Sequence, residues 1–421
     1  MNNFKVSKIF AREIIDCRGY PTLEVEVELE GGAIGRVGVP AGKSTGSHEA
    51  AELRDREPRY HGLGVRMAVH NVNQIISPAL VGMDSSRQRE LDRYMCEALD
   101  GTDNKSNLGS NAIVGVSLAL ARAAASASGL PLYRYLNTSA HVIPVPLFNL
   151  INGGQHASSD LEIQEFCIFP TGAQDITHAL QIATEVSAEL AKMLVQKYGK
   201  FAINVGDEGG FVPPMTGIRE PLDMLVAAVD KAGYTDLVAY GLDCAATHWY
   251  DRETGFYHLA GEKLSRSNLI ELYADLCQQY QLVTIEDALD EDDFDGWAEL
   301  TSRLDIQLVG DDLFTTSPER IKMGVERGAA NALLWKVNQI GTLSEALDAA
   351  ELAFRSGYNV MVSERSGETE DDIIADLSVA LNCGQIKTGA PVRGERTSKY
   401  NRLIRIQEEL GSSAVYGGAL R

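Results

Sequence analysis

The chain opens with two runs of alternating apolar and polar residues, at Val6–Asp16 and Thr22–Glu30. The second contains LEVEVELE, and a period of two is typical of a strand with one buried face. A glycine-rich segment, GVPAGKSTGSHEA, follows, and helical patterns then extend over Ala50–Leu136. Within them, Asn111–Gly129 is rich in small helix-forming residues, which predicts a tightly packed helix. These patterns predict an N-terminal α+β domain, with a sheet followed by helices.

A second domain is expected because 421 residues exceed the size at which a single core stops growing. The proline-interrupted segment IPVPLFNLINGG, at Ile143–Gly154, is the candidate junction. The expected domains are therefore residues 1–140 and residues 141–421.

Beyond residue 240 the chain repeats a short apolar run, an ionisable residue at its end and an amphipathic helix. The ionisable residues are Asp243, Glu286, Asp311, Lys336, Glu364 and Lys387. Their spacing of 23 to 43 residues suits consecutive βα units and a parallel sheet. An open doubly wound sheet also repeats βα units, but it gathers its ligands at one switch point. Six successive strands with ionisable ends favour a closed (β/α)-type barrel, whose strand ends meet at one mouth.

The overall charge limits the classes of partner. A formal net charge of −21 argues against binding to nucleic acid or to an anionic membrane, since both attract clustered positive charge. The six cysteines are scattered and form no C-x-x-C pair, which fits reduced thiols in a cytoplasmic protein. The first residues, MNNFKVSKIFAREIID, lack the apolar core of a signal peptide, and no stretch approaches 18 apolar residues. A soluble cytoplasmic protein is therefore expected.

The first three of these strand-end residues are all acids: Asp243, Glu286 and Asp311. Converging carboxylates repel one another, so at least one pKa would rise unless a cation lies among them. A hard divalent cation such as Mg²⁺ is the natural occupant, and no histidine or cysteine accompanies the acids at zinc-ligand spacing. The alternative is a solvated acidic rim without metal.

Two lysines, Lys336 and Lys387, are expected at the same mouth. A lysine near a divalent cation and a second ammonium group has a lowered pKa, which suits a general base. The other lysine can hold a substrate carboxylate, and the alternative is that each lysine only neutralises the acids.

Other segments offer weaker candidates. Glu165 lies in IQEF and Glu208 in VGDEGG, where a carboxylic acid could protonate a leaving hydroxyl, although VGDEGG is equally typical of a tight turn. AGKSTG lacks the spacing of a phosphate-binding P-loop, and it is either a mobile loop whose Ser44 reaches a metal or a simple turn. Arg365 and Ser366 suit phosphate recognition by a guanidinium fork and a hydroxyl.

The chain as a whole resembles the enolase family (phosphopyruvate hydratases). The resemblance is carried by REIIDCRGYPTLEVEV, AGKSTGSHEAAELRD, NGGQHA, IQEF, VGDEGG, LDCAA, IEDALDEDDFDGW, GDDLFTT, KVNQIGT, RSGETED, GQIKTGAP and KYNRLIRIQEEL. It implies a modified (β/α)8 TIM-type barrel capped by an N-terminal α+β domain. It further implies two Mg²⁺ ions, an enediolate formed beside a carboxylate, and interconversion of 2-phosphoglycerate and phosphoenolpyruvate.

The resemblance also assigns roles to individual residues. Asp243, Glu286 and Asp311 would bind the first metal ion, and Ser44 would help to bind the second. Lys336 would be the base, the pair Glu208 and Glu165 would act on the hydroxyl, and His156 would close over the substrate. The residues expected to bind substrate are Lys387 at the carboxylate, Arg365 and Ser366 at the phosphate, and Gln164, Ala41 and Lys43 around them. A homodimer, or a higher oligomer, would include contacts of Arg12 with Glu408 and of Glu24 with Arg405.

Three departures from the family pattern surround the expected substrate. SERSGETED places Glu364 where enolases carry histidine, and AGKSTG replaces SGASTG, so Ala41 loses a hydroxyl and Lys43 adds a charge. Trp335 puts a bulky ring beside Lys336. An anion at position 364 is expected to weaken ordinary substrate binding or to change the chemistry. Three interpretations follow: an enolase, a paralogue such as carboxyphosphonoenolpyruvate synthase of phosphonate biosynthesis, or a non-catalytic binding protein.

Overall fold

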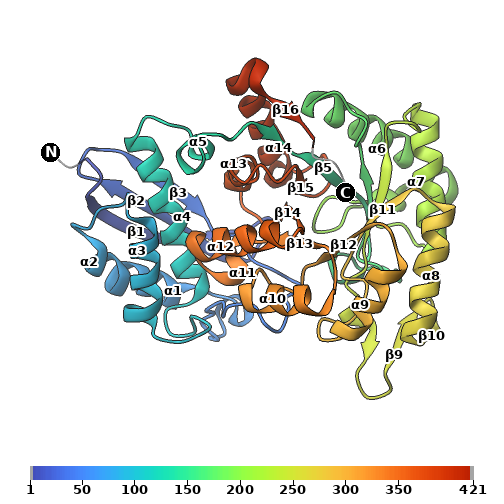
Figure 1. Ribbon diagram of the computed structural model, residues 1–421, viewed down its shortest axis with the longest axis horizontal. Coiled ribbons are helices and arrows are strands. Elements are labelled where there is room, and N and C mark those ends of the chain that lie inside the picture. Colours follow the sequence, from blue (N-terminus) through green and yellow to red (C-terminus); the bar gives the residue numbers. More distant parts are fainter. Residues whose placement is uncertain (1–2, 418–421) are drawn as a thin grey trace.

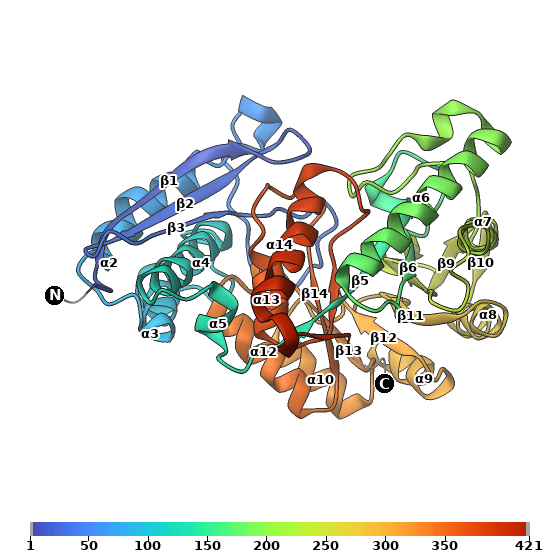
Figure 2. The same cartoon turned by 90° about the horizontal axis from the view of Figure 1, so that it is seen from above.

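The N-terminal part of the chain forms an antiparallel sheet that rests on a helix. In this computed structural model, which describes residues 3–417, β1 (Val6–Ile15) pairs with β2 (Pro21–Leu29), and β2 pairs with β3 (Ile34–Gly38). The alternation predicted a half-buried strand, and the apolar residues of β2 are indeed buried while its glutamates are more exposed. Figure 2 shows this sheet lying over α4 (Ser110–Ala127).

Small residues allow α4 to approach the sheet closely. A Cβ atom added to Gly35 of β3 would lie 2.1 Å from the carbonyl oxygen of Ala119, so the strand and the helix backbone are in direct contact. By length and composition α4 could cross a membrane, contrary to the expectation that no stretch approaches this length. However, 83% of this stretch is buried inside the protein, which is the behaviour of a core helix. The predicted helix at Asn111–Gly129 is thus present, whereas residues 51–56, within the expected helical region, are irregular.

Within residues 3–417, eight strands close into a barrel in the order β11-β12-β13-β14-β15-β5-β6-β7. They are β5 (Val145–Asn152), β6 (Glu165–Phe169), β7 (Ala239–Asp243), β11 (Leu282–Glu286), β12 (Gln307–Gly310), β13 (Ala332–Trp335), β14 (Asn359–Ser363) and β15 (Gln385–Lys387). All neighbours are parallel except β6, which is antiparallel to both β5 and β7. The predicted closed barrel of modified type is confirmed.

Helices surround the barrel and cover the N-terminal sheet (Figure 1). Those of the N-terminal part are α1 (Arg66–Asn71), α2 (Ser77–Leu80), α3 (Gln88–Arg93), α4 and α5 (Leu132–Leu136). Those of the barrel part are α6 (Ile176–Tyr198), α7 (Arg219–Ala232), α8 (Arg266–Gln279), α9 (Phe294–Arg303), α10 (Pro318–Arg327), α11 (Val337–Ile340), α12 (Leu343–Arg355), α13 (Ile373–Ala380) and α14 (Gly394–Leu410). The remaining strands are β4 (Val142–Ile143), β8 (Tyr250–Asp251), β9 (Phe256–Leu259), β10 (Glu262–Leu264) and β16 (Val415–Tyr416).

The segment expected to be the domain junction is regular structure. Ile143–Gly154 contains all of β5, which is a barrel strand flanked by β15 and β6. Pro146 is the second residue of that strand and lies opposite Ile386 of β15. A proline near the start of a strand removes only one ladder hydrogen bond, so it does not exclude the strand. The interpretation of the prolines as interruptions of regular structure was therefore wrong for Pro146, whereas Pro144 does lie between β4 and β5.

The close approach of β3 to α4 can be tested by adding one methyl group. Gly35→Ala should destabilise the protein by about 1–3 kcal/mol, because the clashing atoms belong to the helix backbone and cannot move cheaply. Differential scanning calorimetry should show a lower unfolding temperature. The matched control is Gly394→Ala, where an added Cβ meets no atom within 4 Å. Equal unfolding temperatures for the two variants would contradict the packing described here.

Candidate active site

The barrel strands place ionisable side chains in the mouth by simple alternation. On β13, Ala332 and Leu334 belong to the small apolar cluster inside the barrel, while Leu333 and Trp335 belong to the larger surrounding core. Successive residues of a strand point to opposite faces, so Lys336, directly after Leu334 and Trp335, points inward. The Trp335 indole instead donates to the carbonyl of Ala346 in α12, at 2.5 Å. The expectation that this ring borders the substrate was wrong.

Lys387, at the end of β15, contacts three acids that belong to strands β6, β7 and β11. Its Nζ lies 2.9 Å from Asp243 Oδ2, 2.8 Å from Glu286 Oε2 and 3.2 Å from Glu165 Oε1. All four side chains are almost completely buried. Burial alone would lower the pKa of Lys387, but the surrounding carboxylates raise it well above its usual value, so this ammonium is firmly charged.

Lys336 pairs with the third of the predicted metal acids. Its Nζ lies 2.5 Å from Asp311 Oδ2, and Gln339 Nε2 donates to the other oxygen of that carboxylate at 2.8 Å. Burial would lower the pKa of Lys336, yet Asp311 raises it overall. The sequence predicted a lowered pKa because it placed a divalent cation beside the lysine, but the contact with Asp311 raises the pKa instead.

The acids fit a cation, although they are not packed around a single point. In the described residues, two groups have ligand atoms that all lie within 4.8 Å of one another: His156 with Glu165 and Glu208, and Asp287 with Asp311 and Asp312. Asp243, Glu286 and Asp311 do not form such a group, because an ammonium group occupies the space beside each of them. One oxygen of Glu286 is nevertheless buried without a hydrogen-bond partner. An all-oxygen donor set with an unsatisfied carboxylate oxygen suits Mg²⁺.

The second group of Asp287, Asp311 and Asp312 has a structural explanation. The carboxylate of Asp287 accepts the backbone N–H groups of Asp311 and Asp312, both at 2.9 Å. These two hydrogen bonds hold the end of β12 against the end of β11.

His156, Glu165 and Glu208 form a compact group on the other side of the mouth. His156 Nδ1 lies 3.4 Å from Glu165 Oε1 and 3.3 Å from Glu208 Oε1, and Asn149 donates to Glu208 Oε2 at 3.1 Å. Burial and the neighbouring Glu208 charge raise the pKa of Glu165 well above its usual value. Burial also disfavours ionisation of Glu208, but the nearby His156, Lys387 and Arg396 hold its pKa below its usual value, while burial lowers the pKa of His156 itself. Of the two carboxyls, Glu165 is therefore the harder to ionise.

Most predicted site residues meet at one small cavity of about 10 Å³, which is room for about one water molecule. Its lining is Ser44, His156, Gln164, Glu165, Glu208, Asp243, Lys336, Ser363, Glu364, Arg365, Ser366 and Lys387. Glu286 and Asp311 do not line it but contact the two lysines that do. Ala41 is buried in a main-chain bridge with Gly367, so it does not reach the cavity.

Lys43 also lies outside the cavity, and its charge has a different partner from the one expected. Its Nζ lies 2.9 Å from Asp207 Oδ2, where it joins the glycine-rich loop to the turn that carries Glu208. The lysine is thus paired with a carboxylate of the same chain and does not face the space for a substrate.

Glu364 is neutralised by Arg396, a residue that the sequence did not single out. Arg396 Nη1 is in close contact with Glu364 Oε2, and both side chains are completely buried. Burial raises the pKa of Glu364, and Arg396 opposes that rise. The anion expected at position 364 is therefore paired with a buried cation of the same chain. The only signal in the sequence was that a buried glutamate needs a cationic partner.

Arg396 also supports both sides of the site through backbone carbonyl groups. Its Nη1 donates to Arg365 O at 2.7 Å, and its Nη2 donates to Ser366 O at 2.7 Å and to Asp207 O at 3.0 Å. One guanidinium thus holds the segment of the expected phosphate-binding residues next to the turn that carries Glu208.

Comparison with known proteins assigns the family. Residues 6–136 match the family model of the enolase N-terminal domain, and residues 140–421 match that of the enolase C-terminal TIM barrel domain. The chain belongs to the enolase family. It is 57% identical over 419 residues to the enolase of Methanocaldococcus jannaschii, and the aligned region covers 99% of this chain and 98% of the relative. It is 56% identical over 422 residues to the enolase of Thermococcus kodakarensis, with coverage of 99% and 98%.

The enolase family resemblance carried by the motifs is therefore confirmed, and the chain is an enolase-family lyase. Two of the departures from the family pattern do not act where they were expected. Trp335 lies in the layer between barrel and helices, and Lys43 lies in an ion pair with Asp207. Glu364 remains as the change that lines the cavity, and one of its oxygens is buried without a partner.

The Glu364–Arg396 pair should be strongly coupled. Arg396→Met should cost about 3–5 kcal/mol of stability, because it leaves a buried carboxylate without its counterion. The double variant Arg396→Met with Glu364→Leu should be less destabilised than the sum of the two single variants. Urea unfolding measures all three, and Arg303→Met, which breaks an exposed pair with Glu271, is the control with little effect. Strict additivity would show that the pair is not the unit described here.

Proposed function

We propose that this enolase-family chain is a Mg²⁺-dependent lyase that interconverts 2-phosphoglycerate and phosphoenolpyruvate. The observation that carries the proposal is the convergence of two buried ammonium groups, Lys336 and Lys387, with acids from four strands at one mouth of the barrel. A charged, enclosed site of this kind suits a small anionic substrate whose reaction creates further negative charge.

The two lysines have different tasks in this proposal. Lys336 would remove the proton beside the substrate carboxylate once Asp311, whose contact raises the pKa of this lysine, is bound to a cation instead. Lys387, whose pKa is raised well above its usual value, holds the carboxylate as a fixed cation. Asp243, Glu286 and Asp311 would hold one Mg²⁺ ion, and Ser44 would contribute to a second. Bound Mg²⁺ supplies positive charge that neutralises these acids and stabilises a dianionic enediolate.

The carboxyl pair acts on the leaving hydroxyl. The raised pKa of Glu165 favours its protonated form, and both Glu165 and Glu208 lie within ion-pair distance of His156 Nδ1. Glu208 with Glu165 delivers a proton to the departing oxygen, while His156 closes this side of the cavity. Because the cavity admits about one water molecule, loop movement is required for substrate entry, and closure then excludes water.

Glu364 supports a second candidate, a paralogue such as carboxyphosphonoenolpyruvate synthase that acts on a substrate related to phosphoenolpyruvate. Glu364 lines the cavity where the family pattern has histidine, and one of its carboxylate oxygens is buried without a hydrogen-bond partner. This oxygen can interact with a group that an ordinary enolase substrate lacks. The added cation of Lys43, which also prompted this alternative, gives it less support because Asp207 already pairs with that lysine. A purely binding role has no use for the acid and base positioned in the cavity.

The assembly and location follow as further proposals. We expect domains at residues 1–140 and 141–421, a cytoplasmic location and at least a homodimer. Within the chain, Arg12 pairs with Glu24, whereas Arg405 and Glu408 are exposed on α14. In the proposed dimer, Arg12 would contact Glu408 and Glu24 would contact Arg405 across the interface.

The function is tested by following phosphoenolpyruvate absorbance after 2-phosphoglycerate and Mg²⁺ are added. Wild type should turn over and should lose activity when Mg²⁺ is chelated. Lys336→Met should lower kcat by about 10²–10⁴-fold, because it removes the proposed base. Lys322→Met, on the exposed face of α10, is the control and should keep wild-type activity. An active Lys336→Met variant would contradict the assignment of the base.

The same assay separates the two candidates. If the chain is an ordinary enolase, Glu364→His should change kcat by less than about tenfold. If the chain is a paralogue, wild type should show little turnover of 2-phosphoglycerate, and Glu364→His should increase it. Activity of wild type in the range typical of enzymes, about 1–10³ per second, would dismiss the paralogue.

A further inference from the structure

Arg365, the proposed phosphate-binding residue, is held by acceptors of the protein on four of its N–H positions. Its Nη1 donates to Glu49 Oε2 at 2.9 Å and to Asn338 Oδ1 at 3.2 Å. Its Nη2 donates to Glu49 Oε1 at 3.0 Å and to the carbonyl of Ser44 at 3.2 Å. Among residues 3–417 no acceptor is hydrogen-bonded to its Nε–H, so that edge remains for a ligand.

Glu49 makes the strongest of these contacts. Its carboxylate and the guanidinium form a bidentate pair, and the two side chains are only 10% and 3% exposed. Burial would lower the pKa of Arg365, but Glu49 raises it overall. Bidentate pairs of this type fix the plane of a guanidinium as well as its charge.

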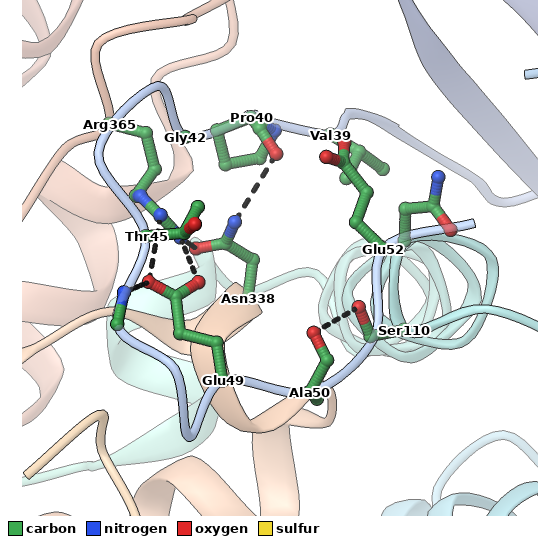
Figure 3. Close-up of a pocket in the computed structure, with 12 residues that line it drawn as sticks. Val39, Pro40, Gly42, Thr45, Glu49, Ala50, Glu52, Ser110, Asn338 and Arg365 are labelled. Carbon is green, nitrogen blue, oxygen red and sulfur yellow. Dashed lines mark hydrogen bonds and ion pairs between the residues drawn. The ribbon is translucent and has the colours of Figure 1, made fainter. Parts of the chain in front are cut away.

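Figure 3 shows Arg365 and Glu49 next to each other in the lining of a second cavity, of about 210 Å³, which the glycine-rich loop also lines. Arg365 also lines the 10 Å³ cavity of the proposed active site, whereas Glu49 does not. Arg365 is thus common to the linings of both cavities, whereas its partner Glu49 lines only the larger one, away from the proposed substrate.

The loop is shaped around this contact. A Cβ atom on Gly42 would lie 2.0 Å from Arg365 Nη2, so only glycine allows the backbone to pass over the guanidinium. The Glu49 carboxylate also accepts hydrogen bonds from the N–H of Gly46 at 3.2 Å and from Gln339 Nε2 at 3.4 Å. Gln339 also donates to Asp311, the partner of Lys336. Glu49 thus connects the loop that carries Ser44 with both Arg365 and the lysine side of the site.

We propose that Glu49 is a positioning residue for Arg365, which turns the free Nε edge of the guanidinium toward a substrate phosphate when the loop is closed. The inference rests on the proposed function, because it takes Arg365 as the phosphate-binding residue. Closure of the loop and correct orientation of the guanidinium are then one event, since Ser44 O and Glu49 belong to the same loop. Without Glu49, a buried cation would lose its counterion and turn toward other carboxylates.

The test compares Glu49→Gln with Glu52→Gln. Glu49→Gln keeps the shape of the side chain but removes its charge, and it should raise KM for 2-phosphoglycerate by about 10- to 100-fold. Its kcat should change by less than about threefold, because the groups that move protons are intact. Glu52 lies three residues further along the loop and pairs with Arg54, so Glu52→Gln should leave both constants unchanged. A purely structural role of Glu49 would instead lower kcat and the unfolding temperature together.

A double variant tests whether the effect passes through the arginine. Glu49→Gln combined with Arg365→Lys should raise KM no further than Arg365→Lys alone, because the residue that Glu49 positions is already lost. Additive effects of the two substitutions would overturn the proposal.

Inorganic phosphate, followed by ³¹P NMR with Mg²⁺ present, separates this inference from the proposed function. If wild type does not turn over 2-phosphoglycerate but binds phosphate, and Glu49→Gln weakens that binding about tenfold or more, the function fails and the positioning role stands. Equal phosphate affinity for wild type and Glu49→Gln overturns the positioning role. Absence of phosphate binding by wild type likewise overturns the positioning role, whereas the turnover assay alone decides the proposed function.

Discussion

The site depends on the pairing of opposite charges that the barrel forces out of water. Transfer of an isolated carboxylate or ammonium group into a protein interior is very costly, so such groups must be paired. Here Lys387 meets Asp243, Glu286 and Glu165, and Lys336 meets Asp311, all from different strands. Closure of the barrel brings these strand ends together, and the apolar interior below them excludes water. The same burial that makes the charges expensive makes their interactions with a substrate strong.

The N-terminal part of the chain completes what the barrel begins. Its glycine-rich loop lies over the mouth, with a main-chain bridge between Ala41 and Gly367 and the Lys43–Asp207 ion pair. Ser47 donates to Glu291 through both its backbone N–H and its hydroxyl, at 3.0 and 2.5 Å. The active site therefore belongs to neither part alone, because the residues facing the cavity come from both. Loop position and site geometry are physically linked.

Alternation and repeat spacing were sufficient to predict much of the architecture. Period-two alternation identified β1 and β2, and an ionisable residue at the end of each apolar run identified six of the eight strands of the closed barrel. The reversed direction of β6 and the inclusion of Pro146 in β5 could not be read from local patterns, because strand direction is decided by pairing partners.

The same patterns brought most site residues to one mouth but misjudged their neighbours. Trp335 was placed beside the substrate because it precedes Lys336, although alternation turns adjacent residues to opposite faces. Lys43 and Glu364 were considered as free charges, and the structure pairs them with Asp207 and Arg396. Partners that are distant in sequence could not be found from one chain alone. For that reason the sequence placed Glu364 correctly in the site but did not predict that Arg396 balances its charge.

The central claim is that acids from three strands bind a divalent ion opposite two ammonium groups. Titration with Mn²⁺, followed by electron paramagnetic resonance, tests it directly because free and bound Mn²⁺ give different signals. Glu286→Gln should weaken Mn²⁺ binding by about tenfold or more, since it removes one of the proposed ligands, whereas Glu299→Gln on the surface of α9 should not. Equal affinity for wild type and Glu286→Gln would contradict the account.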